Sequence, residues 1–133
     1  MGSVAAVPTS EAIRAAVDAY VDASNRNDKS AVIAMFAPDC EWFDPVGQPP
    51  HAGREGVAEF WDQTREMAES IEMVPRGIVV CGNEAAMVFA IRATVAGTVM
   101  EMDAVETFAV DDDGLFTNVK AYWDMARGRV VEA

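Results

Sequence analysis

The sequence predicts an α+β fold in which three N-terminal helices pack on a strongly curved, mainly antiparallel sheet that encloses an apolar pocket. Apolar residues recur at helical spacing up to about residue 70, and then alternate with a period of two to about residue 123. Helices followed by a run of strands are typical of α+β domains, and a curved sheet wrapped on helices leaves a concave face suited to a small ligand. We expect one domain over residues 1–133, with loose ends at about 1–8 and 127–133.

Three helices are predicted from apolar stripes and the residues that flank them. The first helix begins after an N-cap at Thr9 or Ser10, ends at 25–28, and carries a stripe formed by Ile13, Val17, Tyr20 and Val21. A second, shorter helix is expected to run to about Ala37, where Pro38-Asp39 ends it, with an inward face of Val32, Met35 and Phe36. The third helix is predicted over about 54–70.

Five strands are predicted around and after the third helix. A short apolar strand covers 40–43, and longer period-two patterns cover about 73–81, 85–96, 98–110 and 115–123. Turn signals at 82–83, 96–97 and 111–114 separate the last four patterns. Because the separating turns are short, the last four strands are expected to form an antiparallel meander.

The charge balance narrows the class of partner. Ten basic residues against 22 acidic residues give a net charge of −12. Such a field repels nucleic acid and anionic lipid, so we expect neither as a partner, and no apolar stretch approaches the length of a membrane span. A small, neutral, apolar ligand fits this balance best. Cys40 and Cys81 lie in apolar strand patterns without a convincing signal peptide, so we expect reduced core cysteines and a cytoplasmic protein.

The segment from Asp44 to Glu55, DPVGQPPHAGRE, contains the first candidate functional residue. Asp44 ends the short strand, and the proline after it disfavours helical backbone. Period-two alternation then places Cys40, Trp42 and Asp44 on one strand face, so a carboxylate lies in line with an indole. This pattern favours a general base in an apolar pocket. The alternative is that Asp44 only ends a strand and starts a turn, which Asp-Pro pairs often do.

Glu106 and Tyr20 are further polar candidates among apolar neighbours. Glu106 shares one strand face with Met102, Ala104 and Phe108, and we place this face in the pocket. Burial there would raise the pKa of the carboxyl, so that the neutral acid could donate a hydrogen bond. Tyr20 lies in the apolar stripe of the first helix. The alternatives are a satisfied or interface-paired glutamate and an ordinary core tyrosine.

Motifs for bound metals and cofactors are not found in the sequence. His51, the only histidine, lies in a Pro-rich loop where we expect it to be exposed. No His, Cys or Asp cluster has the spacing of metal ligands, and no glycine-rich phosphate loop is present. We therefore expect no metal and no cofactor.

The residues Asp44-Pro-Val-Gly-Gln-Pro-Pro, Gly53-Arg-Glu55, Phe60 and Ala121-Tyr-Trp123 resemble those of the bacterial steroid Δ5-3-ketoisomerases, members of the NTF2-like or SnoaL-like superfamily of cone-shaped folds. The resemblance covers about residues 10–125. It implies an isomerase without a cofactor that shifts a β,γ double bond into conjugation with a 3-ketone through a dienolate, and it implies a homodimer. By this resemblance Asp44 is the base, and Tyr20 and Glu106 hold the dienolate oxygen.

The resemblance also implies which residues line a steroid pocket: Phe36, Trp42, Phe60, Trp61, Met87, Phe89, Ile91, Met102, Ala104, Val119 and Trp123. Two departures from the family pattern stand out. Glu106 replaces an aspartate, and Phe36 and Trp61 occupy positions where the family has tyrosines that support the hole. We therefore predict an altered oxyanion hole in which Trp61 donates its indole N–H.

Two other functions remain open on the same fold. One is a different SnoaL-like enzyme, such as a polyketide cyclase or an epoxide hydrolase. An epoxide hydrolase would need an arginine in the site, and the strand parity of Arg92 points it away from the inferred pocket face. The other is a binding protein for sterols or similar apolar ligands without catalytic activity.

Overall fold

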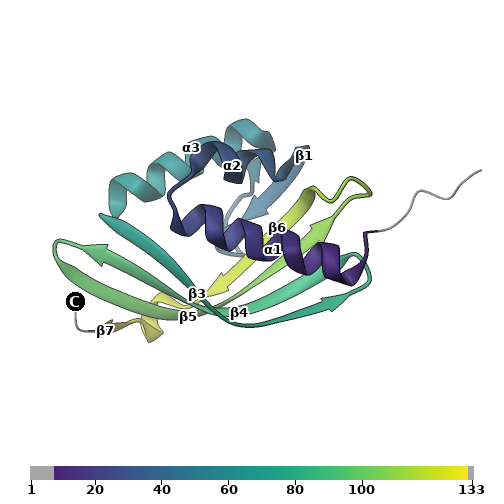
Figure 1. The fold of residues 1–133 in the computed structure, drawn as a ribbon. Coiled ribbons are helices and arrows are strands. Elements are labelled where there is room, and N and C mark those ends of the chain that lie inside the picture. The colour runs from purple at the N-terminus through teal and green to yellow at the C-terminus, as the bar shows by residue number, and fades with distance from the viewer. Residues whose placement is uncertain (1–7, 132–133) are drawn as a thin grey trace, which may run out of the picture.

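Three α-helices lie over one face of a curved sheet in the computed structural model, which describes residues 8–131 (Figure 1). The helices are α1 (Ser10–Asn25), α2 (Lys29–Ala34) and α3 (Gly53–Met67). The strands are β1 (Phe36–Phe43), β2 (His51–Ala52), β3 (Ser70–Cys81), β4 (Glu84–Val95), β5 (Thr98–Val110), β6 (Phe116–Trp123) and β7 (Arg129–Val131), and a 3-10 turn, η1 (Met125–Arg127), precedes β7. The expected class, with three helices on a mainly antiparallel curled sheet, is confirmed.

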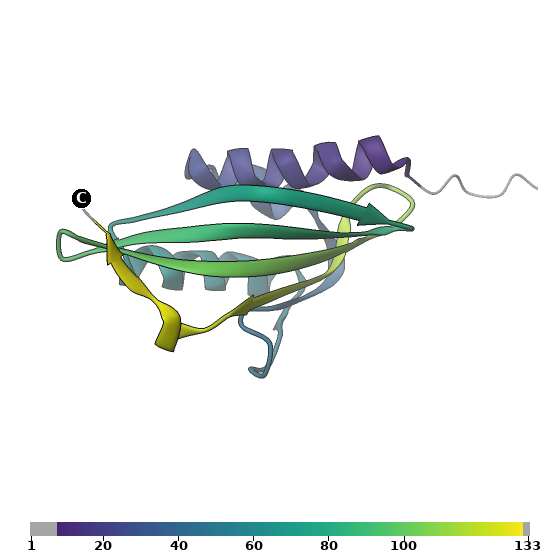
Figure 2. The ribbon, with the colours of Figure 1, turned by 90° about the horizontal axis from the view of Figure 1, so that it is seen from below.

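The seven strands form one sheet in the order β2-β1-β6-β5-β4-β3, with β7 paired to β5. The β3–β4–β5–β6 meander is antiparallel throughout, as the short turns between these strands require. The pairing of β1 with β6 is parallel, which is possible because α3 and the whole meander lie between them in the chain. Figure 2 shows the sheet face that is turned away from the three helices, with β7 along its margin.

The first helix forms as its sequence predicts. The Thr9 hydroxyl accepts a hydrogen bond from the backbone N–H of Ala12, which caps one of the free donors at the helix start. The predicted apolar stripe is buried, and its residues pack toward the sheet. The turn at 96–97 is also confirmed: Ala96 and Gly97 both have positive φ, as a type I′ hairpin turn requires.

The second helix is shorter than we predicted and the strand after it is longer. The helix ends at Ala34, and Phe36 begins β1 instead of lying on a helix. The backbone N–H of Phe116 donates to the carbonyl oxygen of Met35, so pairing with β6 takes over from the helix at this point. Pro38 lies inside β1 rather than ending the helix. It is tolerated because β2 pairs with β1 only at residues 41 and 42, so that β1 is an edge strand at Pro38.

The last segment contains a strand that the sequence did not indicate. Residues 129–131 pair with 99–101 of β5, within the segment that we expected to be loose. The other expected loose residues, 1–7 and 132–133, lie outside the described residues. Within residues 8–131, none of the helices is long and apolar enough to cross a membrane.

Candidate active site

Asp44 is half-buried and lies directly after β1, at the start of a loop that runs beside β6. The backbone N–H of Val46 donates to the carbonyl oxygen of Ala121, which fixes the loop against β6. The indole Nε1 of Trp123 donates to Oδ1 of Asp44 over 2.8 Å. Burial raises the pKa of the Asp44 carboxyl from 3.8 to about 6, against the lowering effect of the Trp123 hydrogen bond. Asp44 can therefore both lose and accept a proton near neutral pH.

Glu106 lies on the inner face of β5 and is 2% exposed. Its register partners are Met87 of β4 and Ala121 of β6. Burial raises the pKa of this carboxyl well above its ordinary value, and the negative charge of Asp44 raises it further. The polar hydrogens of Trp42 and Tyr20 nearby oppose this rise in the pKa of Glu106. Burial and the Asp44 charge thus both favour the protonated form of Glu106.

Tyr20 extends from α1 toward the same region and is 4% exposed. Three phenylalanine rings contact its ring edge to face, at centroid distances of 5.4 Å for Phe108, 5.8 Å for Phe116 and 6.4 Å for Phe36. Burial raises the pKa of the phenol well above 10, and the carboxyls of Glu106 and Asp44 raise it further. The raised pKa favours the protonated phenol, which has an O–H to donate.

The fold brings these three residues together from distant parts of the chain. Because the Asp44 loop binds Ala121 and Ala121 is opposite Glu106, the two carboxyls flank the same point of β6. Tyr20 contacts Phe108, which follows Glu106 on the same strand face. One ionisable base, one neutral acid and one phenol at a buried place can move a proton on carbon and hold a negative oxygen. Among residues 8–131, no three His, Cys, Asp or Glu side chains converge as metal ligands would.

The predicted lining residues are mostly packed around this place. Seven of the eleven predicted positions are buried, namely Phe36, Trp42, Trp61, Met87, Phe89, Ala104 and Val119. Three more are partly buried and pack against this cluster, namely Phe60, Ile91 and Trp123. Met102 is half-buried outside this cluster. Two surface depressions lie elsewhere, one lined by residues at 26–33 and one between the ends of α1 and α3 and the start of β3. Neither is lined by Asp44, Tyr20 or Glu106, so the apolar ligand pocket stays a prediction.

Two expectations about single residues were wrong. His51 is half-buried rather than exposed, because β2 pairs with β1 and the imidazole stacks on Phe60 with ring centroids 4.0 Å apart. Burial lowers the pKa of this histidine. Cys81 is exposed at the end of β3 rather than part of the core, because β3 is an edge strand there, whereas Cys40 is buried as expected. Both cysteines are free.

Trp61 lies on α3 and is buried. The guanidinium of Arg65, one turn later, lies over the Trp61 ring with its Cζ 3.6 Å from the centroid. Arg65 also donates to Asn27 and Thr64, and burial lowers its pKa. Whether the Trp61 N–H serves the oxyanion hole stays a prediction.

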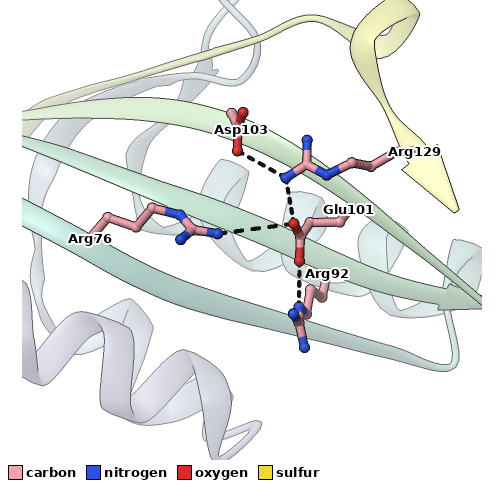
Figure 3. Close-up of polar contacts among 5 residues, drawn as sticks. All are labelled: Arg76, Arg92, Glu101, Asp103 and Arg129. Carbon is pink, nitrogen blue, oxygen red and sulfur yellow. Dashed lines mark hydrogen bonds and ion pairs between the residues drawn. The ribbon is translucent and has the colours of Figure 1, made fainter. Parts of the chain in front are cut away.

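Arg92 points away from the helices, as its strand parity predicted, and belongs to an ion-pair cluster on the other sheet face (Figure 3). Its Nε donates to Oε2 of Glu101 over 2.6 Å. Arg129 of β7 binds both Glu101 and Asp103, and Arg76 of β3 lies 4.0 Å from Glu101. Glu101 is 5% exposed beneath these guanidiniums. Asp103, whose role the sequence left open, binds Arg129 in this cluster. Arg92 belongs to the same cluster and therefore lies outside the candidate site.

Sequence reasoning missed the hydrogen bond between Trp123 and Asp44, although it named both residues. They are 79 positions apart, and a donor on one strand has no sequence signal that points to an acceptor on another. It also did not indicate that the buried Nε1 of Trp42 lacks a hydrogen-bond partner in the described part of the chain. A buried indole N–H normally finds a partner.

Comparisons with known proteins identify the domain family and the fold. The model of the SnoaL-like domain matches residues 17–119. A steroid delta-isomerase from Nocardioides simplex is 27% identical over 111 residues, which are 84% of this chain and 89% of that protein.

Solved structures share the fold at low identity. The epoxide hydrolase/cyclase-like enzyme SalBIII, which acts in pyran ring formation in the polyether salinomycin, superposes with a TM-score of 0.84 at 23% identity, over 91% of this chain and 97% of that one. A Δ5-3-ketosteroid isomerase from Mycobacterium sp. superposes with a TM-score of 0.81 at 23% identity, over 90% of this chain and 98% of that one. At these identities the two structures establish the fold alone.

Proposed function

The chain belongs to the SnoaL-like domain family, and within it we propose that the protein is a steroid Δ5-3-ketoisomerase that works without a cofactor. The observation that carries this proposal is the grouping of Asp44, Glu106 and Tyr20, where burial raises the pKa of Asp44 to about 6 and favours the protonated forms of Glu106 and Tyr20. The 27% identity to a steroid delta-isomerase supports the same activity.

Asp44 is the general base in this proposal. It removes the proton from the carbon between the ketone and the alkene, and it returns that proton two carbons away to give the conjugated enone. A base with a pKa of about 6 is mostly ionised at pH 7 and, once protonated, is acidic enough to give the proton back. The Trp123 hydrogen bond holds one carboxylate oxygen, and Oδ2 is left to reach the substrate.

Glu106 and Tyr20 hold the oxygen that becomes negative when the dienolate forms. Both are neutral donors in a buried place, where hydrogen bonds to a developing charge are stronger than in water. Each of the two residues keeps its proton while it donates a hydrogen bond. The clustered apolar and aromatic side chains around them orient flat rings and exclude water, so a steroid is the proposed substrate class.

The deciding experiment mixes the purified protein with androst-5-ene-3,17-dione and follows the ultraviolet absorbance of the conjugated enone. We expect Asp44→Asn to lower kcat by about 10²- to 10⁴-fold, the usual contribution of a general base. Asp39→Asn is the matched control, because Asp39 is an exposed carboxylate in β1, the strand that ends just before Asp44. Conversion that is absent in the wild type, or equal in wild type and Asp44→Asn, overturns the proposal.

A second candidate is a binding protein for the same class of ligand. Tyr20 and Glu106 would then bind a ketone or phenol oxygen and Asp44 would have no catalytic task. Tight binding of a planar phenolic steroid by both wild type and Asp44→Asn, without turnover, would favour it. A SnoaL-like cyclase or epoxide hydrolase is supported by the shared fold with SalBIII, but Arg92 faces away from the site and binds Glu101.

We also propose a homodimer and a cytoplasmic location. Figure 2 shows the sheet face turned away from the α-helices. This face carries exposed apolar side chains, among them Val88 at 49% and Tyr122 at 44% exposure. Val105 of β5 is paired with Val88 of β4 on one side and with Tyr122 of β6 on the other, so the three residues make a continuous apolar strip across these strands. Light scattering that gives the mass of one chain would overturn the dimer. Two free cysteines are in keeping with a reducing compartment.

A further inference from the structure

Two buried side-chain atoms lack a hydrogen-bond partner in the part of the chain that the structure describes: Nε1 of Trp42 and Oε1 of Glu106. A buried polar group without a partner is costly, and in native proteins such a group often has a task in binding or catalysis. The indole N–H can only donate. The neutral Glu106 carboxyl also has a proton to donate. Both atoms are therefore suited to an oxygen that accepts hydrogen bonds.

The sheet register places the two residues on either side of β6. Trp42 of β1 is opposite Val119, and Glu106 of β5 is opposite Ala121, two residues further along β6. Adjacent strands lie about 4.8 Å apart, so the two backbones are about 10 Å apart and both side chains extend over the inner face of β6. The indole N–H is near enough to lower the pKa of the Glu106 carboxyl, although no hydrogen bond joins the two side chains in the described part of the chain.

Aromatic neighbours fix the orientation of the Trp42 ring. Its centroid lies 4.9 Å from that of Phe60 in an edge-to-face contact and 5.3 Å from that of Phe36. The side chain is 6% exposed, so it has little freedom to turn its N–H toward water. A donor held in this way needs no reorganisation when an acceptor arrives.

We propose that the Trp42 indole is a third donor to the ketone oxygen of the substrate, beside the Tyr20 phenol and the protonated Glu106 carboxyl. This inference rests on the proposed isomerase function and adds a catalytic residue to it. A ketone oxygen has two lone pairs and a dienolate oxygen has three, so the third donor contributes most after the proton has left carbon. The indole keeps its proton throughout, and only its hydrogen bond strengthens.

The Trp42 indole supplies a donor in place of the family's tyrosines, because those tyrosine positions carry Phe36 and Trp61 in this chain. Phe36 has no polar atom, and its ring packs against both Tyr20 and Trp42. The Trp61 ring contacts the Arg65 guanidinium, and its N–H is not among the unpartnered buried atoms of the described residues. Trp42 is thus the indole whose donor is both buried and free to bind a ligand.

The test replaces Trp42 by 3-benzothienylalanine, which keeps the two-ring shape and removes the N–H, and in parallel by phenylalanine. The probe is testosterone labelled with ¹⁸O at its only carbonyl, and the readout is the infrared frequency of that carbonyl in the bound state. We expect the bound band to move to higher frequency in both Trp42 variants, because a lost hydrogen bond strengthens the C=O bond. Turnover of androst-5-ene-3,17-dione should fall about 10- to 1,000-fold, mainly in kcat, as for loss of one oxyanion donor.

The Glu106→Ala background separates direct contact from an effect passed through Glu106. A direct donor still shifts the carbonyl band when the indole N–H is removed in that background. A band that is unchanged in the benzothienyl variant, or a shift that disappears in the Glu106→Ala background, overturns the inference while isomerisation by the wild type stands. A wild type that neither binds testosterone nor converts the β,γ-ketone overturns the proposed function, and the inference with it.

Discussion

The indole Nε1 of Trp123 donates a hydrogen bond to Oδ1 of Asp44 over 2.8 Å, between residues 79 positions apart in the chain. Burial disfavours the Asp44 carboxylate, and this hydrogen bond favours it. The outcome of the two effects is a pKa of about 6. The bond therefore offsets part of the effect of burial on the ionisation of the proposed base, and it occupies Oδ1.

Replacing Trp123 with phenylalanine should raise the pKa of Asp44 above 6. The ring volume is nearly kept, but the donor that stabilises the carboxylate is lost. A hydrogen bond to a charged group contributes about 1.5–3 kcal/mol, so we expect kcat/KM at pH 6 to fall about tenfold or more. At pH 9 the carboxylate is ionised in both proteins and the loss should be smaller. A pH–rate profile whose acidic limb stays in place would contradict this prediction.

Asp44→Asn should stabilise the folded protein as it removes activity. The folded-state pKa of Asp44 is raised from 3.8 to about 6, so the contribution of Asp44 is most favourable below 3.8 and is lost as the pH rises through 6. At pH 8 the ionised, buried carboxylate should cost about 2–3 kcal/mol relative to asparagine. Asparagine keeps an oxygen that can accept from Trp123.

Urea unfolding of the wild type and Asp44→Asn between pH 4.5 and 8 measures this effect. The free energy of unfolding of the variant should exceed that of the wild type by an amount that grows with pH. A difference that does not depend on pH would show that Asp44 is not titrating in the folded protein near pH 6.

Glu106→Gln and Glu106→Ala should differ in activity because the acid acts as a neutral donor. Glutamine has the same length, has no charge and keeps N–H donors, so we expect kcat to fall about tenfold or less. Alanine removes the donor, and kcat should fall about 10²- to 10³-fold. Steady-state kinetics of both variants at pH 7 check this order. Equal losses in the two variants would mean that Glu106 does not act by donating a hydrogen bond.

Most of the fold could be predicted because its apolar periods are uninterrupted. The stripe on α1 and the period-two patterns of β4 and β5 gave these elements nearly to the residue. The segment 34–40 could not be predicted, because Pro38 is compatible both with the end of a helix and with an edge strand. β7 was missed since three residues carry no period, and its place depends on Arg129 binding Glu101 and Asp103.

The candidate site could be predicted in part. Strand parity placed Glu106 inside and Arg92 outside, because both strands are regular where these residues lie. The pairing of Trp123 with Asp44 and the free indole of Trp42 depend on how strands from opposite ends of the chain align. That alignment depends on three-dimensional packing, which cannot be read from the pattern of a single sequence.

Glu101→Gln should destabilise the protein and loosen β7 without changing turnover by the folded enzyme. The Glu101 carboxylate binds guanidiniums from β4 and β7, and the hydrogen bonds from Arg92 and Arg129 lower its pKa below 4.5 (Figure 3). Glutamine removes the charge and leaves Arg76, Arg92 and Arg129 to repel one another. Because the folded-state pKa is lowered, the stability that Glu101 contributes is present above its unfolded-state pKa and is lost as the pH falls through the folded-state pKa.

Thermal melting at pH 7 and pH 4, together with amide hydrogen exchange along β7, measures the role of Glu101. The difference in Tm between wild type and Glu101→Gln should be large at pH 7 and smaller at pH 4, and the amides of 129–131 should exchange faster in the variant. Asp62→Asn is the matched control, since Asp62 pairs with Lys29 while 57% exposed, and such a pair contributes little. If both variants lose the same small amount of stability, the arginines do not depend on Glu101, and β7 must be held by its backbone pairing with β5 alone.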